Sequence, residues 1–74
     1  MKEGQVVNYY GFIGEIETED KKYLFIRDNI IGDINVNDTV FFRGENINGY
    51  DVAFFVQSKN EDLSLYMESM RNER

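Results

Sequence analysis

Short segments in which apolar and polar side chains alternate make up most of the chain before Ser58. Alternation with a period of two is typical of β-strands, because successive side chains of a strand point to opposite faces of a sheet. Residues that favour turns, mainly glycine, asparagine and aspartate, separate these segments. The pattern predicts five strands, at residues 5–10, 12–18, 22–27, 39–43 and 51–57.

Five short strands within this length favour a small closed barrel, because closure removes exposed edges that a small sheet cannot protect. We therefore expect an all-β fold with one five-stranded antiparallel barrel over residues 1–57. Gly14 is expected to mark a β-bulge, since Ile13 and Ile16 lie three residues apart and need a register shift to share a face. Gly44 and Gly49 are expected to be turn residues.

The pattern changes from period two to a helical period after Ser58. It predicts one amphipathic α-helix over residues 60–72, with Asn60 as the capping residue and acidic residues in the first turn. The apolar stripe of this helix consists of Leu63, Tyr66, Met67 and Met70. We expect the stripe to pack on the barrel, and the alternative is a partner protein or a homodimer formed through this helix. Residues 58–74 are thus predicted as a C-terminal helical extension of the same single domain.

The third predicted strand carries the candidate site. Alternation places Leu24 and Ile26 on one face, which we assign to the core, and Tyr23, Phe25 and Arg27 on the other. Rings on a sheet surface can stack on nucleobases while a guanidinium contacts phosphate, so this face is a candidate platform for single-stranded nucleic acid. The alternative is that the rings reflect only the preference of aromatic residues for strands.

Composition narrows the possible chemistry. The 74 residues include no cysteine and no histidine, which excludes disulfides, thiolate or imidazole metal sites and nucleophiles activated by histidine. We interpret the acidic group of Glu15, Glu17, Glu19 and Asp20 as a solvated hairpin, because a filled small barrel offers no pocket to perturb carboxylates for catalysis. We therefore expect no enzymatic activity, no cofactor and no metal.

Charge and hydropathy bear on the partner and the location. The formal net charge of −6 opposes nucleic-acid binding, because phosphate contacts normally supply most of the non-specific affinity. The basic residues Lys22, Arg27 and Arg43 lie in predicted strands and are the expected phosphate contacts. No apolar run approaches the roughly 20 residues of a membrane span, and the first residues lack an apolar signal segment. We expect a cytoplasmic protein without membrane contact.

Several strand motifs, read in order, resemble those of the bacterial cold-shock domain. They are Gly4-Gln5-Val6, Gly11-Phe12-Ile13, Leu24-Phe25-Ile26-Arg27, Val40-Phe41-Phe42 and Val52-Ala53-Phe54-Phe55-Val56. The resemblance covers about residues 4–57 and implies an OB-like barrel that binds single-stranded RNA or DNA. It also implies that Tyr10, Phe12 and Phe25 stack on bases, and that Arg27 stands where the family usually has histidine. Asp28 replaces a further aromatic residue of the family and would repel phosphate.

Two functions remain open from the sequence. The first is non-catalytic binding of single-stranded RNA or DNA by four rings and three basic side chains, namely Tyr10, Phe12, Tyr23, Phe25, Lys22, Arg27 and Arg43. The second is a protein-protein interaction or adaptor module, in which the acidic surface or the C-terminal helix binds a protein. The charge around the aromatic face separates the two, since positive potential favours the first function and acidic surroundings favour the second.

Overall fold

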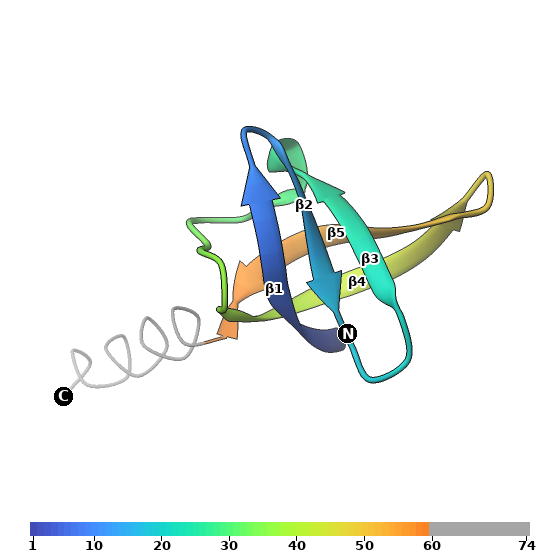
Figure 1. Ribbon diagram of the computed structural model, residues 1–74, viewed down its shortest axis with the longest axis horizontal. Helices are drawn as coiled ribbons and strands as arrows, with labels where there is room; N and C mark the ends of the chain where they lie inside the picture. The colour runs from blue at the N-terminus through green and yellow to red at the C-terminus, as the bar shows by residue number, and fades with distance from the viewer. Residues whose placement is uncertain (60–74) are drawn as a thin grey trace, which may run out of the picture.

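The computed structural model describes residues 1–59 as a five-stranded all-β barrel (Figure 1). The strands are β1 (Lys2–Tyr10), β2 (Ile13–Glu17), β3 (Lys22–Ile26), β4 (Thr39–Ile47) and β5 (Tyr50–Ser58), with a 3₁₀ turn η1 (Arg27–Asn29) after β3. The predicted strands and the closed barrel are therefore confirmed, although β1, β4 and β5 are longer than predicted. The helix predicted for residues 60–72 lies outside the described residues.

The barrel closes in the order β1-β2-β3-β5-β4. All neighbouring strands are antiparallel except β3 and β5, which are parallel and meet at Leu24 and Val52. The prediction of a wholly antiparallel barrel is thus wrong at this one seam. After β3 the chain crosses to the edge of β1 that is not paired with β2, and β4 pairs there. The next strand, β5, then lies beside β3 and runs parallel to it.

Side chains from every strand fill the barrel. The buried apolar residues are Val6, Ile16, Tyr23, Phe25, Ile34, Val40, Phe42, Ala53 and Val56. The Tyr23 ring packs edge-on against the Phe42 ring, with 4.9 Å between ring centroids, a geometry that aromatic pairs favour. Ile34 reaches this core from the connection between β3 and β4. Two rings on β3 are therefore structural members of the core.

Two glycines make room for these rings. A Cβ atom placed on Gly14 would meet the Phe25 ring and lie 2.6 Å from the Asn8 carbonyl oxygen. A Cβ atom on Gly44 would lie 2.8 Å from Cε2 of Tyr23. Such distances leave no room for a side chain at either position. Each glycine therefore allows a core ring to pack directly against the backbone of the neighbouring strand.

This packing reverses the predicted faces of β3. Phe25 is 0% exposed and Tyr23 is buried, whereas Ile26 is 42% exposed and Leu24 is half-buried. The assignment of Tyr23 and Phe25 to the ligand face is therefore wrong. Both rings point into the barrel, where they pack against Gly14 and Gly44.

The predicted roles of the two glycines are also corrected. Gly14 pairs in regular register with Phe25, and the irregularity lies in β1, between Val6 and Asn8. Gly44 lies within β4 and not in a turn. Gly49 does lie in a turn, with a φ of 88°. Glycine within a strand therefore indicates close packing here, as it often does where another group approaches the backbone.

The opposite environments of two phenylalanines provide a test of the faces. We predict that Phe25→Ala lowers the free energy of unfolding by about 3–5 kcal/mol, since it empties a fully buried ring site. Phe12→Ala is the matched control, because Phe12 is 67% exposed and should change stability by less than about 0.5 kcal/mol. Urea unfolding of both variants measures the difference. Equal losses in the two variants would contradict the inward orientation of Phe25.

Candidate functional site

An apolar surface covers the outside of four strands. We call it the outer apolar face, and it consists of Ile13, Leu24, Ile26, Ile47, Tyr50, Val52 and Phe54. The strand register brings these residues together, because Ile13 pairs with Ile26, Leu24 with Val52 and Ile47 with Tyr50. Residues that pair across two strands have side chains on the same side of the sheet. The face therefore runs without interruption from β2 through β3 and β5 to β4.

The middle of this face is hollowed. An open hollow of about 370 Å³ is lined by Ile13, Leu24, Phe25, Ile26, Ile47, Asn48, Tyr50 and Val52. Asn48 is the only one of these lining residues with a polar amide side chain, and Tyr50 adds a hydroxyl. Contiguous exposed apolar surface of this kind is uncommon on monomeric proteins and marks contact sites.

A bulge in β5 adds an exposed ring beside this face. The register shifts between Phe41 and Arg43 of β4, while Ala53 and Val56 of β5 are both buried. The two intervening residues, Phe54 and Phe55, therefore lie outside the core. Bulges commonly redirect side chains in this way.

Phe55 adopts a backbone conformation that is unfavourable for a bulky residue. Its φ is 55°, in the left-handed region, and its side chain is 53% exposed. A non-glycine residue in such a sparsely populated conformation costs on the order of 1–3 kcal/mol. The exposed ring cannot repay this cost through core packing, which points to a role in contacts outside the chain.

Beside Phe55 lies a second hollow with charged walls. It has a volume of about 300 Å³ and is lined by Arg43, Glu45, Ile47, Phe54 and Phe55. Arg43 Nε and Glu45 Oε2 are 2.7 Å apart and form an ion pair across its rim. Because Ile47 lines both hollows, the second hollow continues the outer apolar face.

Ion pairs within the protein neutralise several of its basic groups. Lys21 Nζ lies 3.5 Å from Asp51 Oδ1, and Lys59 Nζ lies 3.3 Å from Glu3 Oε2. Together with the Arg43 pair, these contacts reduce the positive charge available to phosphate. The outward side of β2 also carries Glu15, which accepts a hydrogen bond from Asn8 Nδ2 at 2.6 Å. Lys22 and Arg27, at the two ends of β3, are in no ion pair among residues 1–59 and are exposed.

The structure divides the predicted nucleic-acid residues into separate groups. Tyr10 and Phe12 are 76% and 67% exposed at the turn between β1 and β2. Arg27 is exposed beside them, and its backbone N–H donates to the Phe12 carbonyl oxygen at 2.7 Å. Tyr23 and Phe25 lie in the core and leave the predicted platform.

The other two predicted basic residues lie away from this turn. Lys22 is at the start of β3, where it pairs in register with Glu17, whereas Arg27 follows the end of that strand. Arg43 lies on β4 in its ion pair with Glu45. Of the predicted set, the fold brings together only Tyr10, Phe12 and Arg27.

The sequence did contain a signal for the outer apolar face. Gly14 can face inward only if its neighbours Ile13 and Glu15 face outward. The paired strand must then turn Leu24 and Ile26 outward as well. The signal was missed because an inward-facing glycine and a bulge glycine look alike in a single sequence.

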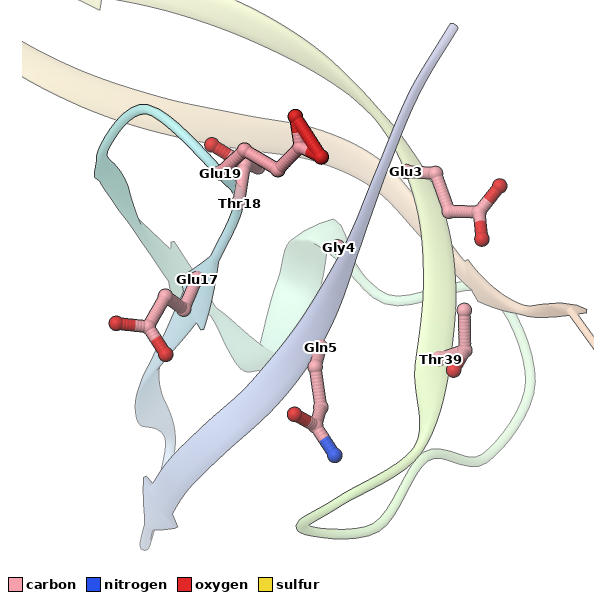
Figure 2. A pocket seen from close by; sticks show the side chains of 7 residues that line it. All are labelled: Glu3, Gly4, Gln5, Glu17, Thr18, Glu19 and Thr39. Carbon is pink, nitrogen blue, oxygen red and sulfur yellow. The ribbon is translucent and has the colours of Figure 1, made fainter.

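A separate polar hollow of about 620 Å³ lies between β1, the loop after β2 and β4 (Figure 2). It is lined by Glu3, Gly4, Gln5, Glu17, Thr18, Glu19 and Thr39. The carboxylates in Figure 2 point apart rather than toward a common centre. Within residues 1–59, no group of three acidic side chains is arranged to hold a metal ion. We assign no chemistry to this hollow.

Comparison with known proteins leaves the family open. No protein-family model matches the chain, and no curated protein matches its sequence. Within the part of the chain that the structure describes, no helix is long and apolar enough to cross a membrane. The resemblance to the cold-shock domain therefore stays a prediction.

Replacement of Phe55 tests whether its conformation is a cost to the fold. Asparagine tolerates the left-handed region better than other non-glycine residues, so we predict that Phe55→Asn raises the free energy of unfolding by about 1 kcal/mol. The control Phe54→Asn should lower it by about 1 kcal/mol, because Phe54 has no positive φ to relieve and the substitution removes its strand packing. Denaturant melts compare the two. An equal loss of stability in both variants would show that Phe55 is a packing residue.

Proposed function

We propose that this protein is a non-catalytic binding module with an OB-like barrel, and that its ligand is another protein. The observation that carries the proposal is the chemistry of the outward positions on β2 and β3. These positions hold Ile13, Glu15, Glu17, Lys22, Leu24 and Ile26. They supply apolar contact area, two carboxylates and one amine, but no stacking ring.

The barrel topology supports the OB-like assignment. The strand order β1-β2-β3-β5-β4 fits a closed five-stranded Greek-key barrel of that type. OB-type barrels bind their ligands on the face of the second and third strands and on the adjoining loops. The outer apolar face occupies this position, so its composition bears directly on the ligand.

The charge distribution indicates the character of the partner. The chain carries a net charge of −6, and Lys21, Arg43 and Lys59 are already paired with carboxylates. Complementary potential steers association and excludes partners of like charge. The partner segment should therefore combine apolar side chains, which fill the hollow, with basic residues at its edges.

Site-specific photo-crosslinking tests the proposed contact. A benzophenone amino acid at position 26, in the middle of the outer apolar face, should form an adduct with a partner protein in the cells that make this chain. The same amino acid at position 19, in the acidic loop, is the control and should form none. The adduct partner is then purified, and its binding to the wild type and to variants is measured by calorimetry.

Two charge-matched variants decide the outcome. Ile26→Lys should weaken binding of the purified partner by at least about tenfold, because it places a charge in an apolar contact. Glu19→Gln makes the same change of +1 in formal charge outside the face and should have a much smaller effect. Equal binding by the wild type and Ile26→Lys would contradict a protein contact at this face.

Single-stranded nucleic acid is the second candidate, and one local feature favours it. Tyr10 and Phe12 expose two rings at one turn, with Arg27 held beside them through the Phe12 carbonyl oxygen. Two rings and a guanidinium are the elements of a small stacking site. The net charge of −6 and the absence of exposed rings on β3 weigh against a longer binding track.

Fluorescence anisotropy with short labelled RNA and DNA tests this second candidate. If it holds, Phe12→Ala should weaken binding by about 1–3 kcal/mol, the usual range for one stacked base. Arg27→Glu should also reduce the magnitude of the salt slope by about 0.7 for each lost phosphate contact. Under the protein-binding proposal we expect no saturable binding of either oligonucleotide at low salt.

A further inference from the structure

Part of β4 has a free edge. The β1 strand covers only the beginning of β4, from the pair of Gln5 with Thr39 to the pair of Lys2 with Phe42. Residues 43–47 continue β4 beyond this seam and pair only with β5. Figure 1 shows the β4–β5 hairpin as an arm whose end extends away from the other strands, while its base still pairs with β3 at Val52.

The turn at the end of the arm determines which backbone groups face the free edge. Asn48 and Gly49 have φ values of 53° and 88°, as in the type I′ turns of two-residue hairpins. The flanking residues Ile47 and Tyr50 then form a hydrogen-bonded pair. Hydrogen-bonded and non-hydrogen-bonded pairs alternate along an antiparallel ladder.

This alternation assigns each residue of the arm. Arg43, Glu45 and Ile47 direct their backbone N–H and C=O groups toward β5. Gly44 and Asn46 direct theirs away from β5, toward the free edge. No turn or loop backbone bond of the described residues ends on Gly44 or Asn46. The edge therefore presents two N–H donors and two C=O acceptors in the spacing of a strand.

We propose that an extended segment of a partner protein adds to the sheet along residues 43–47 of β4. Its backbone would pair with Gly44 and Asn46, and it would lie in line with β1, which occupies the preceding part of the same edge. Strand addition of this kind gives affinity through the main chain and specificity through alternate side chains. The inference rests on the proposed protein-binding function and specifies how the partner is held.

The side chains beside the edge specify the chemistry of the added strand. Arg43, Glu45 and Ile47 alternate on the outward side of β4, next to the hollow that contains Phe54 and Phe55. An apolar residue of the added strand fits beside Ile47, and a lysine or arginine fits beside Glu45. The added strand would thus extend the outer apolar face. Its side chains would enter the hollow that Phe55 lines and contact the Phe55 ring there.

A second copy of the chain fits the edge poorly. Antiparallel pairing that uses both Gly44 and Asn46 places Gly44 opposite Asn46 of the other copy, and therefore places Glu45 opposite Glu45. Like charges directly opposite each other destabilise a strand pair. Each copy also carries a net charge of −6, which opposes self-association. A partner segment with basic residues is the better match.

Proline at position 46 tests the inference without removing a bond to β5. Asn46→Pro deletes an N–H that faces the free edge, where proline is tolerated, because Asn46 and Asp51 form a pair without backbone hydrogen bonds. The matched control is Asn46→Thr, which keeps the N–H. Both variants lose the hydrogen bond from Asn46 Nδ2 to Asp51 Oδ1. A difference in affinity between them therefore measures the effect of the backbone N–H of residue 46 and of the proline ring that replaces it.

The probe is a random peptide library displayed on phage and selected on the immobilised wild-type protein. Synthetic copies of the selected peptides are then titrated against the wild type and both variants by calorimetry. We expect apolar residues at alternate positions with interspersed lysine or arginine. Affinity should fall by about tenfold in Asn46→Pro and stay unchanged in Asn46→Thr. Thermal melts verify that both variants fold.

The outcomes separate this inference from the function on which it rests. Peptides that bind Asn46→Pro like the wild type but lose affinity for Ile26→Lys would preserve the protein-binding function and overturn strand addition. A selection that yields no saturable binder would overturn both. A wild-type dimer in sedimentation that Asn46→Pro dissociates would show that a second copy occupies the edge, which also overturns the proposed occupant.

Discussion

The contact between the Phe25 ring and the backbone at Gly14 constrains the whole barrel. A ring of this size fits inside five short strands only where a neighbouring strand has no side chain, and Gly14 provides that position. Once Phe25 faces inward, strand alternation determines which of the remaining residues of β2 and β3 face outward. The apolar character of this outer surface is thus a consequence of how the core is filled.

A second constraint comes from the short seam between β1 and β4. The two strands pair over only part of the length of β4, so the barrel closes while the end of the β4–β5 hairpin remains outside it. The bulge at Phe55 lies beside the end of the β1–β4 seam at Phe42, while β5 still pairs with β3 at Val52. The β4 residues beyond the end of β1 therefore keep an accessible edge, although the barrel itself is closed.

Much of the fold was predictable from period-two alternation. It located all five strands, although β4 was ended too early at Arg43, because Gly44 lies within the strand and not in a turn. Alternation cannot identify which of its two faces is buried, however, and both faces of β3 carry large apolar residues. The choice depended on Gly14 and Gly44, whose partners across the sheet are unknown until the register is known. For the site, Tyr10 and Phe12 were correctly expected at the surface, whereas the free edge and the strained Phe55 depend on register shifts that no local pattern encodes.

The seam between β1 and β4 also has a consequence for the order of folding. The hairpins β1–β2, β2–β3 and β4–β5 join segments that are close in sequence, so their loops close at small entropic cost. The seam joins Gln5 to Thr39 and Lys2 to Phe42, and it must wait until most of the chain is in place. We therefore expect barrel closure to be the slow, late event of assembly, and until it occurs the edge of β4 is open along its entire length.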